Sequence, residues 1–214
     1  MLIRETEQTS PGVWKLTPSD GSAFFLRTDY LSCLSPDVLE RSCHRLASSG
    51  ESSVEFSDEQ YADVLSASLA YSAEVLAMSY LARAEQCRAS LSAKLAKKGL
   101  DWRFIQAALD YLEGRGYLSD RRFAGAWLRS RAIDHAEGRL RLGAELAARG
   151  IGRDVAAAAL DEFFAENDEG LLCRKALARS MKTCRDRDRL FRSLLRKGFT
   201  ASEIRDAMQE ARLV

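Results

Sequence analysis

The 214-residue chain contains only three prolines, and all of them lie near its start, at Pro11, Pro18 and Pro36. Proline ends or kinks an α-helix because it lacks a backbone N–H and its ring collides with the preceding turn. Because no proline follows Pro36, proline interrupts no helix in the rest of the chain. From about residue 57 onward the apolar residues follow helical spacing, and the sequence predicts a mainly α fold.

Long uncharged runs are also missing. The longest one, residues 64–73, has ten residues, whereas a membrane-spanning helix needs about 20 mostly apolar ones. The opening stretch MLIRETEQTS lacks the basic and then apolar regions of a secretory signal. With 46% hydrophobic and 29% charged residues, the chain has the composition of a globular protein with a buried core. We expect no membrane span and a cytoplasmic location.

Metal-ligand patterns are scarce. The five cysteines contain no C-x-x-C spacing, and the only histidines are His44 and His135; a zinc site normally groups four Cys or His ligands. The adjacent pair Cys43 and His44 offers two ligands, but buried reduced thiols are the better interpretation. We expect no metal and no other cofactor. The cysteines are Cys33, Cys43, Cys87, Cys173 and Cys184.

Catalytic motifs are absent as well. The sequence contains no G-x-x-x-x-G-K-[ST] phosphate loop, no G-x-S-x-G nucleophile turn and no H-E-x-x-H zinc motif. Asp110 and Glu113 form a close carboxylate pair on one expected helix, and such pairs are usually solvated surface. The sequence predicts a protein that is not an enzyme.

The formal net charge of +1 hides a division along the chain. Residues 1–76 hold 5 Lys and Arg against 12 Asp and Glu, net −7, and the remaining residues hold 27 against 19, net +8. This pattern is common on ordinary solvated surfaces. It also fits an acidic partner for the C-terminal two-thirds.

The acidic part begins with a predicted β-hairpin. Residues 12–31 alternate apolar and polar side chains on both sides of a Pro-Ser-Asp-Gly turn. A two-stranded hairpin is marginally stable alone, and the helix predicted from cap residue Ser35 is its natural support. Residues 1–56 are therefore expected to form an N-terminal appendage of a hairpin and a helix.

A repeat becomes visible when residues 91–109, 142–160 and 190–208 are aligned without gaps, at spacings of 51 and 48 residues. Each copy has two leucines four residues apart, which give one apolar helix face. A basic residue and a glycine follow, and glycine adopts the left-handed conformation that ends helices. The repeated positions are Leu91, Leu95 and Gly99; Leu142, Leu146 and Gly150; Leu190, Leu194 and Gly198.

Each copy is thus predicted to form a helix, a turn and a second helix. A further helix precedes each of these helix pairs, at residues 71–85, 119–131 and 167–182. The chain is thus predicted to contain three tandem three-helix repeats, at residues 57–115, 116–166 and 167–214. Each repeat is too small to bury much apolar surface alone, so neighbours must pack on one another. We expect an elongated, curved stack.

Arginine is concentrated in two places. In GYLSDRRFAGAWLRSR, residues 116–131, the spacing of Phe123 and Trp127 predicts a core face, while Arg122 and Arg129 share the exposed face and Arg131 can cover the tryptophan ring. Residues 174–197 contain ten Lys and Arg against only Asp186 and Asp188. A solvated helix face is one explanation, and a polyanion or an acidic protein surface as the partner is the more specific alternative. The predicted contact residues are Arg122, Arg129, Arg179, Lys182, Arg185, Arg189 and Arg192.

These stretches resemble the RecX family of bacterial regulators of the RecA recombinase. The resemblance is carried by residues 80–99, by residues 116–131 and by residues 140–151, and with the third repeat it covers about residues 70–214. The second stretch matches most clearly, through Gly116-Tyr117-Leu118, Asp120, Phe123-Ala124, Trp127, Arg129 and Arg131. One departure is the acidic Asp134–Arg139 connection, where the family often has a basic turn. The N-terminal hairpin and helix lie outside the common core.

The resemblance implies a non-enzymatic modulator that lodges in the helical groove of a RecA filament on DNA and usually inhibits strand exchange, ATP hydrolysis and co-protease activity. We expect a monomer. Two alternatives stay open at this point. The basic stretch is also typical of a stand-alone DNA-binding helical repeat, although Phe191 is its only aromatic residue for base stacking. A purely structural adaptor, which binds neither DNA nor RecA, is the third interpretation.

Overall fold

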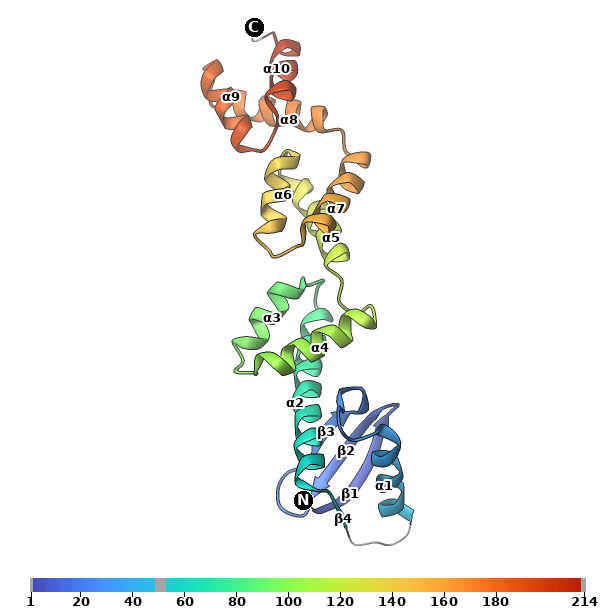
Figure 1. Cartoon of the computed structure of the whole chain (residues 1–214). Helices are drawn as coiled ribbons and strands as arrows, with labels where there is room; N and C mark the ends of the chain where they lie inside the picture. The colour runs from blue at the N-terminus through green and yellow to red at the C-terminus, as the bar shows by residue number, and fades with distance from the viewer. Residues whose placement is uncertain (1, 49–52, 213–214) are drawn as a thin grey trace. The chain divides into compact units, whose positions relative to one another are not determined.

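The structure is a computed structural model that describes residues 2–48 and 53–212, apart from the side chains of residues 43–48. Helices dominate it, and a small antiparallel sheet lies at the N-terminus, which confirms the mainly α class (Figure 1). The chain forms two compact units. The first comprises Met1–Ala84 and Leu91–Leu118, and the second comprises Glu85–Ser90 and Ser119–Val214.

The elements of the first unit follow one another without long loops. They are β1 Leu2–Ser10, β2 Val13–Pro18, β3 Phe24–Arg27, a short 3-10 helix Thr28–Tyr30, α1 Pro36–Ser48, β4 Val54–Glu55, α2 Asp58–Leu81, α3 Arg88–Ala96 and α4 Trp102–Gly114. The first turn of α3 belongs to the second unit. The other elements of the second unit are α5 Asp120–Asp134, α6 Arg139–Ala147, α7 Arg153–Glu166, α8 Glu169–Met181, α9 Arg187–Arg196 and α10 Ala201–Glu210.

The N-terminal hairpin is present, but it is part of a larger sheet. Strands β2 and β3 pair antiparallel, as predicted, and β1 and β4 extend them to the order β3-β2-β1-β4. Strand β1 was missed because Ile3 is its only buried residue, so it has no apolar alternation to detect. The two residues of β4 are too few to give a pattern.

The helix ends confirm the local predictions. Capping boxes are formed at Ser57 and Thr200, where the side-chain oxygen accepts an N–H from the first turn. Asp101 and Ser119 cap α4 and α5 in the same way. The three repeat glycines all have the left-handed backbone that favours glycine, with φ of +80° at Gly99, +80° at Gly150 and +87° at Gly198.

Helix α2 is long and apolar enough to cross a membrane by length and composition, although no uncharged run in it approaches that length. Its buried acids argue for a different role. Asp63 accepts a backbone N–H from Leu34 at 2.8 Å, and Glu74 accepts from Arg27 at 2.6 and 2.7 Å. These bonds tie α2 to the N-terminal strand region. We conclude that α2 is the core helix of the first unit.

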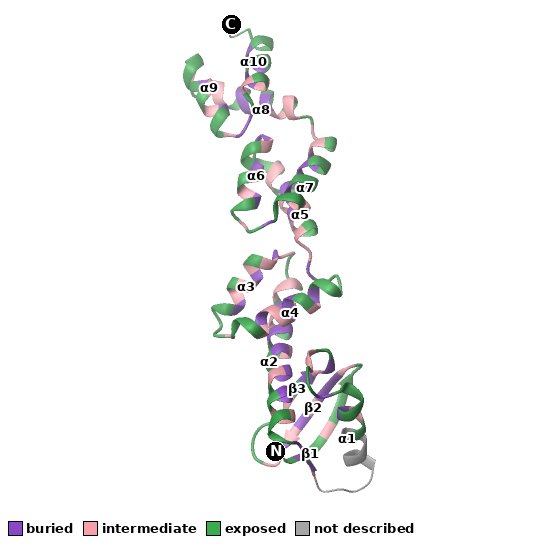
Figure 2. Ribbon diagram, viewed as in Figure 1, coloured by how far each residue is buried: buried purple, intermediate pink, exposed green. Residues whose placement is uncertain are grey.

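Within the second unit, α5–α7 and α8–α10 each surround a core of their own. The repeat leucines are buried in both, and the residue after the turn glycine, Ile151 or Phe199, completes each core. Figure 2 shows the buried positions gathered on the inward faces of these helices. Phe123 and Trp127, predicted as core, lie at its edge and are only partly buried. The outer faces of α5, α8 and α9 carry the arginines.

Candidate interaction surface

The predicted contact residues of α5 lie in different surroundings. Arg122 is held by Glu85, with 2.8 Å between its Nε and the carboxylate oxygen. Arg129 is exposed and, among the residues that the structure describes, has no carboxylate partner. Arg131 lies over the Trp127 ring, as predicted, at 5.7 Å from the ring centroid. Arg149 approaches the same ring more closely, at 4.5 Å.

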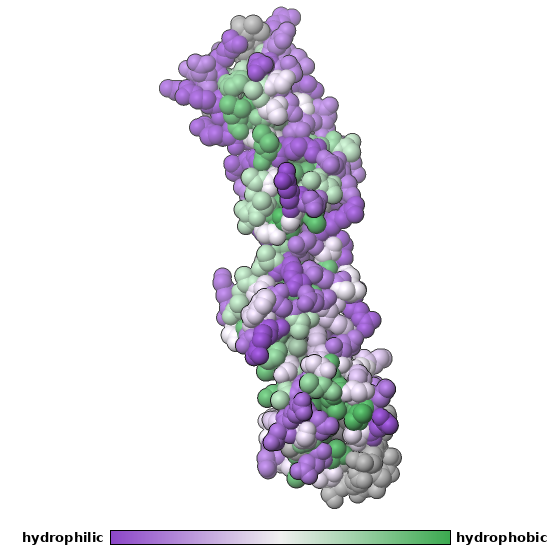
Figure 3. Space-filling view, viewed as in Figure 1, coloured by the Kyte–Doolittle hydropathy of each residue, from purple (hydrophilic) through white to green (hydrophobic). Residues whose placement is uncertain are grey.

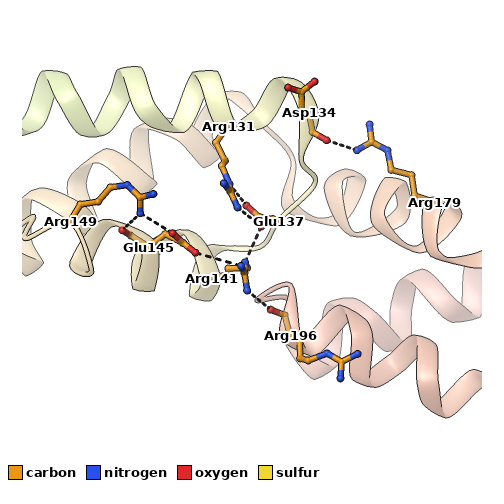
Figure 4. Close-up of polar contacts among 8 residues, drawn as sticks. All are labelled: Arg131, Asp134, Glu137, Arg141, Glu145, Arg149, Arg179 and Arg196. Carbon is orange, nitrogen blue, oxygen red and sulfur yellow. Dashed lines mark hydrogen bonds and ion pairs between the residues drawn. The ribbon is translucent and has the colours of Figure 1, made fainter. Parts of the chain in front are cut away.

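Arg131 also takes part in a network centred on Glu137 (Figure 4). The Glu137 carboxylate, 9% exposed, accepts from Arg131 Nε at 2.7 Å and from Arg141 Nε at 2.9 Å. Burial alone raises the pKa of this carboxyl, but the two guanidinium groups outweigh it and the net pKa is lowered. The acidic α5–α6 connection thus neutralises the arginines around it.

The same connection joins the second and third repeats. Gly138 N–H donates to the Lys197 carbonyl at 2.9 Å, and a Cβ on Gly138 would collide with the backbone of Gly198. On the other side of the connection, Arg179 Nη1 donates to the Asp134 carbonyl at 2.9 Å (Figure 4). Arg179, predicted as a contact residue, therefore has a structural bond as well as an exposed side chain.

The remaining predicted residues belong to the third repeat. Lys182 caps the C-terminal end of α8, Arg185 lies in the α8–α9 connection, and Arg189 and Arg192 lie on α9. All four are exposed. Within the described ranges 2–48 and 53–212, no carboxylate pairs with any of them. Hydrophilic side chains accordingly project from α9 in Figure 3.

An open cleft of about 560 Å³ lies along α9 and brings some of these residues together. Its charged lining consists of Arg189, Arg192 and Arg196, and its base includes Leu190. Arg185 and Lys182 are not part of the lining. The lining residues are Ser180, Thr183, Cys184, Arg189, Leu190, Arg192, Ser193 and Arg196.

Two features were missed from the sequence. Arg196 is not among the predicted contact residues, although it follows Arg192 by one helical turn and the spacing predicts a shared face. The role of Glu137 and Arg141 in joining the repeats was also missed, because it depends on a fold-back of the α5–α6 connection that no local pattern reports. The metal possibility at Cys43 and His44 lies outside the side chains that the structure describes.

Comparison with known proteins gives three consistent results. A family model described as the second three-helix domain of RecX matches residues 119–160. "Regulatory protein RecX" of Treponema pallidum (strain Nichols) is 37% identical over 148 residues, which cover 69% of this chain and 90% of the relative. The chain belongs to the RecX family. A RecX regulatory protein of Halorhodospira halophila is 32% identical over 142 residues, covering 63% of this chain and 85% of that relative.

Solved RecX structures share the fold. A crystal structure of regulatory protein RecX has a TM-score of 0.69 at 21% identity and covers 96% of this chain and 100% of that one. The structure of RecX from Lactobacillus salivarius has a TM-score of 0.55 at 22% identity, covering 68% and 98%. The first likeness extends over the N-terminal strands. RecX-family proteins are regulatory proteins and not enzymes, in agreement with the missing catalytic motifs.

Proposed function

We propose that this RecX-family protein acts in the cytoplasm as a monomer that binds the RecA–DNA filament, lodges in its helical groove and inhibits ATP hydrolysis, strand exchange and co-protease activity. Membership of the RecX family makes RecA the partner. The observation that supports a surface for it is the row of cations on the third repeat. Arg189, Arg192 and Arg196 follow one another along α9 at intervals of one helical turn, and Arg185 lies in the connection just before the helix. None of the four has a carboxylate partner in the described chain.

The electrostatics of this row favour an acidic partner. Cations held close together repel one another, and an anion that binds them removes this repulsion as well as forming charge-assisted hydrogen bonds. Exposed ion pairs within a protein contribute only about 0 to 1 kcal/mol, but they do neutralise the charge of the cations that they hold. The arginines around Glu137 and Glu145 in the second repeat have that neutralisation, and the row on α9 does not. We therefore expect the contact surface to include Arg179, Lys182, Arg185, Arg189 and Arg192, with Arg122 and Arg129 contributing from α5.

The test is the ATPase rate of RecA on single-stranded DNA during titration with this protein. The wild type should repress the rate, and the triple variant Arg185→Ala, Arg189→Ala, Arg192→Ala should need at least roughly tenfold more protein, equivalent to about 1.4 kcal/mol of binding free energy. Absence of any effect from the wild type would remove the proposal.

A matched control removes the same charge elsewhere. Arg4, Arg41 and Lys97 are exposed in the first unit, so their triple alanine variant changes the net charge equally. It should repress the ATPase like the wild type. Equal losses from both variants would show that only net charge matters, and the assignment of the surface to the third repeat would then be wrong.

A second candidate function, direct DNA binding, is favoured by the same row of cations because phosphate contacts come mainly from Arg and Lys. A protein with six to ten phosphate contacts loses roughly 10³ to 10⁵ in affinity between about 50 and 200 mM salt. Fluorescence anisotropy of labelled single-stranded DNA across that range measures this slope. A flat response would eliminate direct phosphate binding, and a protein that binds neither DNA nor RecA would be a structural adaptor.

A further inference from the structure

The middle helix of each repeat begins on an arginine. Helix α3 starts at Arg88, α6 at Arg139 and α9 at Arg187. The first N–H groups of a helix have no partner inside the helix. Each of these three starts therefore offers a backbone donor, a guanidinium group and the positive end of a helix dipole to an anion.

The first two starts are occupied by carboxylates from the following repeat. Arg88 N–H donates to Asp120 at 2.8 Å, and Arg139 N–H donates to Glu169 at 2.8 Å. Asp120 and Glu169 both lie in the first turn of the leading helix of the next repeat. Arg139 Nε is also 3.8 Å from the Glu169 carboxylate. At both junctions, the acidic first turn of one repeat thus accepts the first backbone N–H of the middle helix of the repeat before it.

Two more contacts recur at these junctions. The residue before the arginine donates to the carbonyl that precedes the turn glycine of the next repeat: Cys87 Sγ to Arg149 at 3.3 Å, and Gly138 N–H to Lys197 at 2.9 Å. The turn glycine itself packs against the start of the helix, where a Cβ on Gly150 would be 2.5 Å from the Cβ of Ala89. The two junctions are therefore similar in arrangement, although the donor is a thiol in the first and a backbone N–H in the second.

The corresponding corner of the third repeat is open. Asp186 caps α9 by accepting the Arg189 N–H at 2.8 Å, but within residues 53–212 no carboxylate reaches the N–H or the guanidinium of Arg187. In the second repeat, Arg141 packs against the turn glycine of the next repeat, Gly198. Its counterpart Arg189 instead lines the open cleft of about 560 Å³.

We propose that this corner docks the acidic first turn of an α-helix from a partner protein. Continuity with the two internal junctions defines the shape of the occupant. Its charge is defined by four arginines, which outnumber the two carboxylates at the start of α9, Asp186 and Asp188: Arg185, Arg187, Arg189 and Arg192. Neutral Leu190 and Cys184 in the cleft provide a floor for a packed side chain, which a phosphate backbone does not supply. The proposal goes beyond the function proposed above, because it holds for any partner that presents this chemistry.

The full-length protein can be tested without RecA. Backbone amide shifts of ¹⁵N-labelled protein are followed during titration with a short alanine- and lysine-based helical peptide whose first turn reads Ser-Asp-Glu-Glu. A second peptide of the same composition carries the acids in its last turn, and a short oligothymidylate provides phosphates. The first peptide should shift the amides of Arg187, Asp188 and Arg189 saturably, with at least roughly fivefold higher affinity than the second peptide because only it reproduces the internal junction.

The Arg187→Glu variant should lose this binding, and Arg153→Glu is its matched control at the exposed start of α7. Equal binding of the two peptides would overturn the proposal in favour of simple charge attraction. Shifts caused by the oligothymidylate alone would overturn it in favour of a phosphate site, and no shift from any probe would also overturn it. None of these outcomes depends on the RecA ATPase measurement, so the two proposals fail separately.

Discussion

The second and third repeats are both rich in arginine, but only the second carries acids to match. Arg131, Arg141 and Arg149 are paired with Glu137 or Glu145. Two residues before the first arginine of its middle helix, the second repeat has Glu137 and the third has Arg185. Similar numbers of arginines, 8 in residues 116–166 and 9 in residues 167–214, therefore have different consequences. In the second repeat, Arg131, Arg141 and Arg149 are held by carboxylates, whereas in the third repeat Arg185, Arg189, Arg192 and Arg196 have no carboxylate partner among the described residues.

The largest expected effect breaks the junction between these two repeats. Gly198→Ala combines a left-handed backbone with a collision against Arg141, so we expect a loss of roughly 2 to 5 kcal/mol in the free energy of unfolding of the second unit. Gly99→Ala is the control, because Gly99 has the same φ range and no atom within 4 Å of an added Cβ. It should cost its own unit only about 1 to 2 kcal/mol. Urea denaturation measures both, and equal losses would contradict the tight junction.

Removing the shared acid should have the next largest effect. Glu137→Gln leaves Arg131 and Arg141 without their carboxylate, for an expected loss of about 1 to 3 kcal/mol in unfolding free energy at neutral pH. The pKa of Glu137 is lowered in the folded protein. The stabilisation by ionised Glu137 is therefore fully present above the unfolded pKa of about 4.3. It is lost as the pH falls from there through the lower pKa of the folded protein. The difference in unfolding free energy between the wild type and Glu137→Gln should disappear in acid. A difference that does not change with pH would contradict this role of Glu137.

Arg179→Ala sharpens the comparison by removing one bond between the repeats. The lost hydrogen bond to the Asp134 carbonyl should cost about 0.5 to 1.5 kcal/mol, measured by the same denaturation. Lys175→Ala on the same helix is the control, because Lys175 is exposed and makes no ion pair in the described chain. A cost at Lys175 equal to that at Arg179 would argue against a specific bond.

The smallest expected effects separate the two contact residues of α5. Arg129→Ala should change stability by less than about 0.5 kcal/mol, and Arg122→Ala, which breaks an exposed pair with Glu85, by about 0.2 to 1 kcal/mol. In RecA repression, however, Arg129→Ala should have the larger effect because its guanidinium is not held by an acid. The reverse order would weaken the link between pairing and function.

Local chemistry explains what the sequence predicts well. The helix caps at Ser57 and Thr200 and the left-handed glycines depend on residues close together in the chain, so each was predictable. The paired surroundings of Arg122 and Arg179 were not, because their partners lie 37 and 45 residues away. Strand β1 was not predictable because its backbone pairs with β2 and β4 while its side chains form no apolar face. Composition located the basic surface, and only tertiary contacts distinguish its paired arginines from its unpaired ones.

The most direct test of the central claim gives the third repeat the acid that the second one has. Arg185→Glu places a carboxylate where Glu137 stands in the second repeat, so it should neutralise Arg189 locally and leave the thermal midpoint unchanged. The concentration that half-represses the RecA ATPase should then rise at least roughly tenfold, equivalent to about 1.4 kcal/mol, whereas the charge-matched control Arg4→Glu should repress like the wild type. Repression by Arg185→Glu at wild-type concentrations would contradict the claim that the unpaired cations of the third repeat form the contact surface.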